Sequence, residues 1–316
     1  MKGNRLVGDV GGTNARFAIL DKNNRPHKTQ TLPTKDYSGL VDAIQAYLEH
    51  QHIIDVRSAA IAVANPLLGD VMKMTNNSWS FSISETENTL GLEKLHVVND
   101  FNALARAVPH LNAADIIKVG GGEKKPNAAI AVIGPGTGLG VSGLVPCGQH
   151  YTALQGEGGH VSLGLRTPRE YEIHAVLKKR FGHVSAERAL SGPGLINLQS
   201  ALREIDGLGP LELTPAEITE RACNGSDPIC AEVVQIFCEL LGSCAGNLVL
   251  SLGAEGGVYI GGGIVPKLGD TFIQSGFREQ FEAKGRMSHY LEKIPSFVIA
   301  APHPALLGVA QIYAET

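Results

Sequence analysis

Residues 6–20 read LVGDVGGTNARFAIL, and this stretch decides the fold because it predicts a strand, a glycine-rich reversal and a second strand. Two apolar runs flank Gly11 and Gly12, a spacing that suits a tight hairpin whose turn needs positive φ, which glycine adopts without strain. Missing side chains also let the backbone approach an anion. Successive N–H groups around Gly11, Gly12 and Thr13 can then cradle a phosphate.

Asp9 ends the first predicted strand and directs a carboxylate toward the same space. A carboxylate beside phosphates makes chemical sense when a divalent cation lies between them, since Mg2+ is usually bound by one or two carboxylates plus phosphate oxygens. We therefore expect Mg2+ at Asp9, held through water. An ordinary Gly-Gly hairpin without a ligand is an equal alternative from this segment alone, because short motifs give many false positives.

The composition predicts a soluble protein of about two domains, since 316 residues are long for one core. Apolar residues make up 43% of the chain. No run approaches the roughly 18 uncharged residues of a membrane span, and residues 1–5 are too short for a signal peptide, which favours the cytoplasm. The 27 basic and 31 acidic residues give a net charge of -4, which supplies no field to attract nucleic acid or an anionic membrane.

The five cysteines predict reduced, mostly buried thiols, because no C-x-C or C-x2-C pair indicates a zinc site and the odd number argues against a disulfide framework. They are Cys147, Cys223, Cys230, Cys238 and Cys244. Glycine is enriched, with 38 residues or about 12% of the chain against the usual roughly 7%. The excess falls in short clusters, where we expect the chemistry.

The first half of the chain predicts alternating strands and helices, typical of an α/β domain. Strand patterns occur at 58–64, 71–74 and 95–98, and helix patterns at 39–50, 82–90 and 100–107. Ser82 and Glu85 predict a capping box. Asn99 and Asp100 directly follow a buried strand, and crevices at strand carboxyl ends are where open α/β sheets bind ligands. We place a domain boundary near Pro109.

A second strand, Gly/Thr reversal and strand spans residues 128–145 and is similar to the first hairpin. This likeness predicts duplicated halves facing one nucleotide, each presenting backbone N–H groups to its phosphates. Thr137 and Gly138 lie in the second turn. The segment lacks the Gly-Lys-Ser/Thr of a Walker A loop, and Leu139 breaks the G-x-G-x-x-G spacing, so two common nucleotide folds are disfavoured.

Further candidate site residues lie in the chain after the second hairpin. Taken singly, Glu157, His160 and Glu187 are more often solvated or capping residues than ligands. Residues 256–266 predict a strand running into three glycines, where adenosine would fit against bare backbone at Gly262 and Gly263. Other expected elements are helices at 168–180, from 191, from 215, at 228–252 and at 304–313, and a strand at 297–300. The last helix should pack back on the first domain.

Five segments in this order together resemble the bacterial ATP-dependent glucokinases of enterobacterial type, in the hexokinase, Hsp70 and actin superfamily. They are residues 8–16, 98–101, 136–140, 156–161 and 183–194. The likeness covers nearly the whole chain. It implies an α/β, two-domain, actin-like ATPase (ribonuclease H-like) fold with duplicated halves around a nucleotide and sugar cleft. The implied domains are 1–110 plus 300–316, the smaller, and 111–299, the larger.

The resemblance also implies the reaction and its residues. The γ-phosphate of ATP passes to the 6-hydroxyl of glucose, with Asp100 as the catalytic base. Residues that hold glucose hydroxyls match Asn99, Asp100, Glu157, His160 and Glu187. Positions implied for the nucleotide are Gly8, Asp9, Val10, Gly11, Gly12, Thr13, Thr137, Gly138, Gly262 and Gly263. The family further implies ATP as co-substrate, Mg2+ without zinc, a homodimer, and no nucleic-acid or membrane partner.

The chemistry of these residues agrees with that reaction. Carboxylates, an amide and an imidazole suit hydroxyls that both donate and accept, and phosphoryl transfer needs a base, Mg2+ and N–H groups around the transferring charge.

The loop at 64–70 departs from the family pattern, which has Cys or Gly before Pro66 and a small polar residue after it. Two rival functions remain. A related repressor would carry an N-terminal DNA-binding helix pair and a Cys/His zinc site, whereas this chain has its phosphate hairpin at residue 8. A chaperone-like or actin-like ATPase would lack the sugar-binding set.

Overall fold

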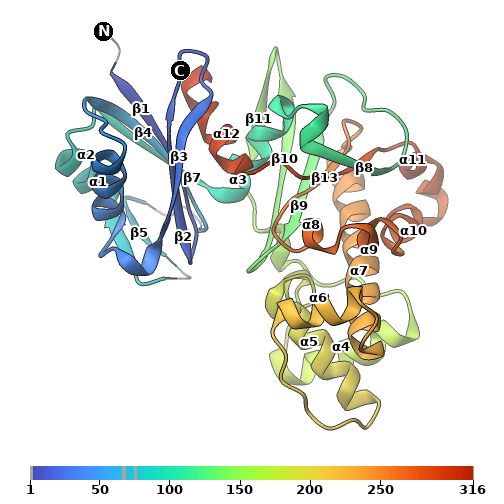
Figure 1. Ribbon diagram of the computed structural model, residues 1–316. Helices are drawn as coiled ribbons and strands as arrows, with labels where there is room; N and C mark the ends of the chain where they lie inside the picture. Colours follow the sequence, from blue (N-terminus) through green and yellow to red (C-terminus); the bar gives the residue numbers. More distant parts are fainter. Residues whose placement is uncertain (1–2, 66–68, 75–76, 316) are drawn as a thin grey trace. The chain divides into compact units, whose positions relative to one another are not determined.

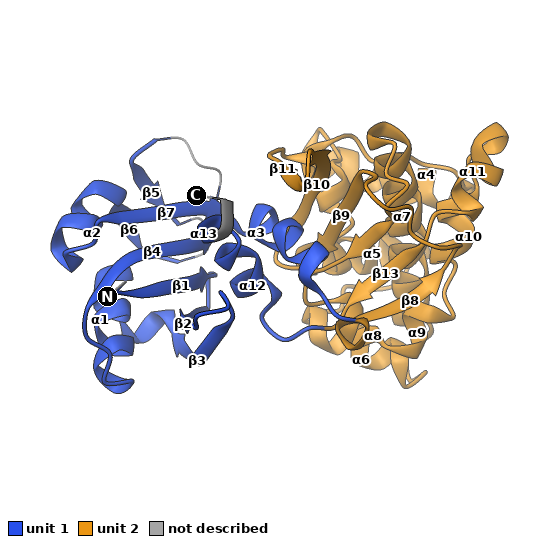
Figure 2. Ribbon diagram, turned by 90° about the horizontal axis from the view of Figure 1, so that it is seen from above, with its two compact units in different colours: residues 1–112, 301–316 blue, residues 113–300 orange. Residues whose placement is uncertain are grey.

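The computed structural model describes residues 3–65, 69–74 and 77–315. The chain forms two compact units, coloured separately in Figure 2. Unit 1 comprises residues 1–112 and 301–316, and unit 2 comprises residues 113–300. The sequence predicts these borders after residues 110 and 299. Both ends of the chain therefore contribute to unit 1, while unit 2 is one continuous segment.

Unit 1 is built on a five-stranded sheet in the order β3-β2-β1-β4-β7 (Figure 1). Its strands are β1 (Asn4–Val10), β2 (Asn14–Leu20), β3 (Pro26–Pro33), β4 (Val56–Val63) and β7 (Lys94–Asn99). The predicted hairpin is β1 and β2, β3 extends it antiparallel, and β4 and β7 continue the sheet parallel to β1. The continuous apolar run of β4 is explained by its central place, where both faces are covered.

Alternate residues of β1 serve the two faces of this sheet. Leu6 belongs to a core cluster with α1 (Leu40–His50), whereas Val7 belongs to a cluster with α12 (Pro304–Ala310). The neighbour of α12 is α3 (Asp100–Ala107), which contributes Ala103 to the second cluster. The sheet of unit 1 is therefore covered by helices on both faces.

The closing helix α12 meets α3 through a glycine. A Cβ on Gly308 would lie 1.7 Å from the carbonyl oxygen of Ala103, so only glycine fits unless the helices separate. This confirms the prediction that the last helix packs on the first domain. The predicted single helix is in fact two, since α12 ends at Ala310 and α13 (Ile312–Glu315) follows.

A small second sheet sets the start of α2 (Ile83–Leu90). It pairs β5 (Val71–Lys73) with β6 (Ser80–Ser82). Ser82 caps α2 by accepting the Glu85 N–H, as predicted, but Glu85 does not complete a capping box. Asp70 acts instead, accepting the Ser82 hydroxyl at 2.5 Å and the Ser84 N–H at 3.0 Å. Asp70, which lies just before β5, has replaced the local partner.

Unit 2 is built on a six-stranded sheet in the order β11-β10-β9-β12-β13-β8. Its strands are β8 (Ile116–Gly120), β9 (Ile130–Pro135), β10 (Leu139–Cys147), β11 (His150–Leu154), β12 (Val258–Ile260) and β13 (Ser296–Ile299). The first five strands in this spatial order repeat the order and directions of the strands in unit 1. β11, β10 and β9 form an antiparallel meander, and β12 and β13 continue the sheet parallel to β9. β8 is added antiparallel beyond β13.

The core of unit 2 is helical and centres on α7. The longer helices are α4 (Pro168–Phe181), α5 (Gly192–Ile205), α6 (Pro215–Cys223) and α7 (Pro228–Leu252). In the described residues α7 is the one helix long and apolar enough to cross a membrane, yet 67% of its apolar window is buried inside the protein. Its predicted limits and its prediction as a core helix are confirmed.

Short helices complete this unit, and one approaches α7 closely. They are α8 (Val265–Leu268), α9 (Asp270–Ile273), α10 (Phe277–Glu282) and α11 (Ser288–Glu292). Gly242 and Gly246 lie one turn apart on α7. A Cβ on Gly242 would lie 2.1 Å from the Phe277 carbonyl oxygen, and one on Gly246 would lie 2.6 Å from that of Phe281. Two glycines therefore let α10 pack directly on the backbone of α7.

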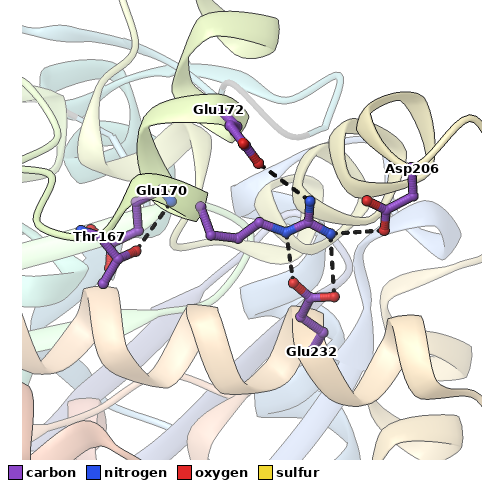
Figure 3. Close-up of polar contacts among 6 residues, drawn as sticks. Thr167, Glu170, Glu172, Asp206 and Glu232 are labelled. Atoms are coloured by element: carbon purple, nitrogen blue, oxygen red, sulfur yellow. Dashed lines mark hydrogen bonds and ion pairs between the residues drawn. The ribbon is translucent and has the colours of Figure 1, made fainter.

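Arg169 ties α4 to α5 and α7. Its guanidinium pairs with Glu172 at 3.4 Å, with Asp206 at 2.7 Å and with Glu232 at 2.8 Å. Figure 3 shows these three carboxylates converging from separate elements. Hydrogen bonds to Asp206 and then Glu232 raise the pKa of Arg169. The cluster is thus a structural link between three helices of unit 2.

The strands that the sequence did not predict are β3, β6, β8 and β11, and all four lie at sheet edges. An edge strand needs no continuous apolar run, because part of it faces water. β3, for example, reads PHKTQTLP and is largely exposed. Short 3-10 helices occupy Thr34–Asp36, Val108–His110, Ala113–Asp115, Gly158–His160, Ala186–Arg188 and Gly285–Met287.

Candidate active site

The turn of the first hairpin is held in place through its carbonyl groups. The carbonyl oxygen of Gly11 accepts from Asn77 Nδ2 at 3.2 Å, that of Gly12 from the Thr34 hydroxyl at 2.8 Å, and that of Thr13 from the Thr34 N–H at 2.9 Å. The Gly11 N–H closes the hairpin by donating to the first residue of β2. Within the described residues, the N–H groups of Gly12 and Thr13 have no acceptor. Two adjacent donors, rather than the three expected, are therefore available to an anion.

The presence of glycine in this hairpin is not explained by the predicted positive φ. Gly11 and Gly12 are not among the positive-φ glycines of the described chain, so the expectation of left-handed turn residues was wrong. Gly8 is buried in β1, where a Cβ would lie 2.6 Å from Ile61 Cδ1. Val10 points into the core. Gly8 and Val10 therefore support the hairpin from within, and Val10 has only its backbone to offer a nucleotide.

Asp9 lies opposite Arg16 across the hairpin. Arg16 Nη1 and Asp9 Oδ2 are 3.2 Å apart, and the side chains are 29% and 18% exposed. Burial raises the pKa of the Asp9 carboxyl, against the opposing influence of Arg16 and His303. His303, at the start of α12, has a left-handed backbone with φ 51°. The sequence did not single out Arg16 or His303, although a three-residue turn would have paired residue 9 with residue 16.

The donor set around Asp9 fits magnesium better than zinc. The described residues contain no group of three or more His, Cys, Asp or Glu side chains that could hold a metal ion. One carboxylate is enough for Mg2+, which completes its octahedron with water and phosphate oxygens. Arg16 Nε is buried without a partner in the described residues, so the Asp9–Arg16 pair is polar and incompletely satisfied.

Asn99 and Asp100 lie where β7 ends and α3 begins. Asn99 is the N-cap, since its Oδ1 accepts the N–H groups of Phe101 and Asn102 at 2.9 and 3.2 Å. Its Nδ2 donates to the Asn65 carbonyl oxygen at 3.4 Å. Asp100 Oδ1 accepts the Phe101 N–H at 2.8 Å. The loop at 64–70, which differs from the family pattern, includes Asn65, but its residues 66–68 lie outside the described residues.

The second hairpin repeats the pattern of the first. The Gly136 N–H closes the turn by donating to the Gly138 carbonyl oxygen at 2.8 Å. The Gly136 carbonyl oxygen accepts the Gly192 N–H from the start of α5, also at 2.8 Å. In the described part of the chain, the N–H groups of Thr137 and Gly138 donate to no acceptor. Each unit therefore presents a pair of backbone donors at the turn of its hairpin.

The loop carrying Glu157 and His160 packs on β10 through two glycines. A Cβ on Gly159 would lie 2.1 Å from the Leu139 carbonyl oxygen, and one on Gly158 would lie 2.7 Å from Val141 Cγ1. The side chains of Glu157 and His160 are exposed on either side of this contact. The Gly-Gly pair thus places two exposed polar side chains directly beside the second hairpin.

Glu187 reaches the same place from another loop. Its Oε2 accepts the Leu139 N–H at 2.8 Å. This loop is joined to the Glu157 loop by a backbone bond from Ala186 N–H to the Val161 carbonyl oxygen, at 2.9 Å. Ser162 Oγ and His183 Nε2, 3.1 Å apart, add a side-chain link. Glu157, His160 and Glu187 are therefore fixed, with the second hairpin, in one part of unit 2.

The late glycines border the same hairpin. Gly262 has φ 78°, and a Cβ there would lie 2.2 Å from the Pro135 carbonyl oxygen, so glycine is required twice over. Among the described residues, no heavy atom lies within 4 Å of a Cβ placed on Gly263. Gly262 thus sets the backbone beside β9, and Gly263 leaves a bare surface of the kind expected for adenosine.

The cysteines differ in part from the prediction. Cys230 and Cys238 are buried, Cys244 is partly buried, and Cys147 and Cys223 are exposed. Burial raises the pKa of Cys238 to about 12 and that of Cys230 to about 11. The two buried thiols are therefore protonated and unreactive at neutral pH, whereas the prediction that most cysteines are buried was wrong.

Comparison with known proteins agrees with this geometry. Residues 6–316 match the Glucokinase family. The glucokinase of Aromatoleum aromaticum is 56% identical over 308 residues, which cover 97% of this chain and 93% of that protein. The chain belongs to the glucokinase family.

Two solved structures extend the likeness of this family member. A glucokinase from an Antarctic psychrotroph superposes with a TM-score of 0.88 at 36% identity, over 100% of both chains. A ROK family glucokinase from Streptomyces griseus, solved in complex with glucose and AMPPNP, shares the fold at a TM-score of 0.66 and 20% identity, over 99% of this chain and 100% of that one. The predicted mixed α/β fold and the resemblance to bacterial glucokinases are confirmed.

Proposed function

We propose that this member of the glucokinase family transfers the γ-phosphate of ATP to the 6-hydroxyl of glucose, giving glucose 6-phosphate and ADP. The observation that carries the proposal is the placement of Asp100. Asp100 follows β7 and begins α3, whose N-cap is Asn99, and its own Oδ1 accepts the Phe101 N–H. A carboxylate at this position suits a base.

The reaction follows from that role. Asp100 accepts the proton of the 6-hydroxyl as its oxygen forms a bond to the γ-phosphorus. The bond between that phosphorus and the β,γ-bridging oxygen breaks, and ADP leaves with the electron pair.

Four further side chains are proposed to hold glucose: Asn99, Glu157, His160 and Glu187. Asn99 uses Oδ1 for the helix cap, so Nδ2, now 3.4 Å from the Asn65 carbonyl oxygen, is the group it would offer the sugar. Glu157 and His160 are exposed and fixed by glycine contacts with β10. Groups left unpaired by a poor substrate give strong discrimination, so this set favours one hexose stereochemistry.

The two hairpins are proposed to bind the ATP phosphates. The paired N–H donors are those of Gly12 with Thr13 and of Thr137 with Gly138. Asp9 would hold Mg2+ through water, and that ion would neutralise charge on the phosphates. Gly262 and Gly263 are proposed to border the adenosine.

Other properties are proposed on family resemblance and composition. The matching strand order of the two sheets supports an actin-like, ribonuclease H-like architecture in which both units act on one pair of substrates. We propose a homodimer in the cytoplasm with no zinc and no nucleic-acid or membrane partner. Size-exclusion chromatography with light scattering tests the dimer.

A coupled assay of ADP release tests the function. The purified protein is given a panel of hexoses with ATP and Mg2+, and then glucose with a panel of phosphoryl donors. Glucose with ATP should give the highest kcat/KM. Turnover without sugar that equals turnover with glucose would instead indicate an ATPase, and absence of any sugar-dependent turnover would contradict the proposal.

A further inference from the structure

Glu187 lies directly against the turn of the second hairpin. Its Oε2 accepts the Leu139 N–H at 2.8 Å. The same oxygen would be 2.4 Å from a Cβ on Gly138, and the carboxylate carbon would be 3.3 Å from it. Gly138 does not have a positive φ. The need for glycine at this position therefore comes from the Glu187 carboxylate, not from the backbone conformation.

The rest of the Glu187 loop is anchored to the same hairpin. The Gly192 N–H, five residues after Glu187, donates to the Gly136 carbonyl oxygen at 2.8 Å. The Ser191 hydroxyl donates to the Glu187 carbonyl oxygen at 2.8 Å. Gly136 and Leu139, at the two ends of the turn, are thus both held by one short segment. The position of Thr137 and Gly138 between them depends on that segment.

We propose that Glu187 is a positioning residue for the nucleotide as well as a ligand of the sugar, and that it couples the binding of the two substrates. The inference rests on the proposed function and deepens it. Oε2 fixes the hairpin through Leu139, while Oε1 makes no hydrogen bond with the described residues and is the oxygen offered to a glucose hydroxyl.

The physical basis is that one carboxylate has lone pairs for several donors at once. A glucose hydroxyl on Oε1 restricts the rotation of the Glu187 side chain, which in turn holds Leu139 and the adjoining N–H groups of Thr137 and Gly138 in place. Whichever ligand binds first removes part of the ordering cost for the second. By linkage, glucose and nucleotide must then raise each other's affinity by the same factor.

The first test measures the affinity of the Mg2+ complex of AMPPNP by calorimetry, with no sugar present. Glu187→Ala removes the acceptor for Leu139 and should weaken AMPPNP roughly 10-fold, as expected for a bond to a charged group. Glu187→Gln keeps a carbonyl acceptor, so its affinity for AMPPNP should stay within about threefold of that of the parent. Glu157→Gln, a neighbouring change with no bond to the hairpin, should leave AMPPNP affinity unaltered.

The second test changes the other partner of the contact by placing a methyl group on Gly138. Gly138→Ala should displace the Glu187 carboxylate, and so weaken glucose roughly 10-fold although residue 138 carries no sugar ligand. In the Glu187→Ala background the same methyl should have little effect, because the atom it collides with is gone. A double-mutant cycle therefore reports the contact itself. Circular dichroism establishes that each variant is folded.

Two outcomes would overturn the inference: Glu187→Ala binding AMPPNP as tightly as the parent, or Gly138→Ala costing equally in both backgrounds. Failure of the proposed function would look different, since the parent protein would then show no glucose-dependent use of ATP. If Glu187→Ala does not fold, the inference is still tested by Gly138→Ala, alone and combined with Glu187→Gln. In that series the glucose and AMPPNP affinities of Gly138→Ala must fall together.

Discussion

Asn99 and Asp100 share one donor, the N–H of Phe101, which lies 2.9 Å from Asn99 Oδ1 and 2.8 Å from Asp100 Oδ1. Asn99 also accepts the Asn102 N–H at 3.2 Å. The start of α3 is therefore capped by the residue before Asp100. Asp100 is therefore not the N-cap of this helix, and a neutral amide at residue 100 should leave the helix intact.

Asp100→Asn should remove most of the turnover and leave glucose affinity nearly unchanged. Asparagine keeps the shape and a hydrogen-bonding group but cannot accept the 6-hydroxyl proton. A positioned general base contributes roughly 10²- to 10⁴-fold, so kcat should fall by at least that range. Steady-state kinetics and glucose titration by intrinsic fluorescence measure the two quantities. A folded variant with kcat within a few-fold of the parent would mean that Asp100 is not the base.

Glu157→Gln and His160→Ala should weaken glucose far more than ATP. Both side chains are exposed and lie on a loop fixed by Gly158 and Gly159, so their loss removes sugar bonds without changing the hairpin. Losing a hydrogen bond to a charged group costs roughly 1.5 to 3 kcal/mol, or about 10- to 150-fold in affinity. Separate KM values for glucose and ATP check this. Equal rises in both would indicate a general structural defect.

Asp9→Asn should raise the Mg2+ concentration needed for half-maximal activity by roughly 10- to 100-fold, the range seen when groups that hold bound metal are altered. The amide keeps the packing beside Arg16 but loses the charge that attracts the ion. Activity titrated with Mg2+ at fixed ATP measures the shift. Glu204→Gln, an exposed change in α5, is the matched control and should leave the titration unchanged. An unshifted curve for Asp9→Asn would place the metal elsewhere.

His96 should make the stability of the protein depend on pH below about 6.5. Burial, followed by repulsion from Lys94, lowers the pKa of His96 in the folded protein. Between that lowered pKa and 6.5 the unfolded chain binds more protons, so the free energy of unfolding falls as pH falls. His96→Gln should lose this part of the slope. Urea denaturation of both proteins between pH 5 and pH 8 checks it, and parallel pH profiles would contradict the prediction.

Gly308→Ala should destabilise unit 1 by about 1 to 3 kcal/mol, the usual cost of overpacking, or more. The new methyl would lie 1.7 Å from the Ala103 carbonyl oxygen, so α12 has to move away from α3. Chemical denaturation measures the loss. Gly209→Ala is the control, because that glycine faces open space without a positive φ and its substitution should change stability by less than about 0.5 kcal/mol.

Local chemistry explains which elements could be predicted from the sequence. The β1–β2 and β9–β10 hairpins, the buried β4 and the long α7 carry continuous apolar patterns, and each was predicted close to its observed limits. The edge strands β3, β8 and β11 carry no such pattern. At Ser82, the partner is Asp70, just before β5, a contact that the spacing of Ser82 and Glu85 cannot reveal.

The same distinction applies to the site. The sequence motifs named the residues, but their supports are long-range. Arg16 was predictable in principle from hairpin pairing, whereas His303 approaches Asp9 only because α12 returns to unit 1. The bond between Glu187 and Leu139, the first residue of β10, joins residues 48 positions apart and has no local signal.

The return of α12 also sets the order in which the chain can fold during synthesis. Unit 2 is a continuous segment, so its whole sequence has left the ribosome before α12 appears. Unit 1 begins first but lacks Leu306 and Val309, which cover one face of its sheet, until the end. Since domains generally fold as units, the N-terminal domain, although synthesised first, is the last to complete its core, and its uncovered sheet face is what a chaperone would meet on the nascent chain.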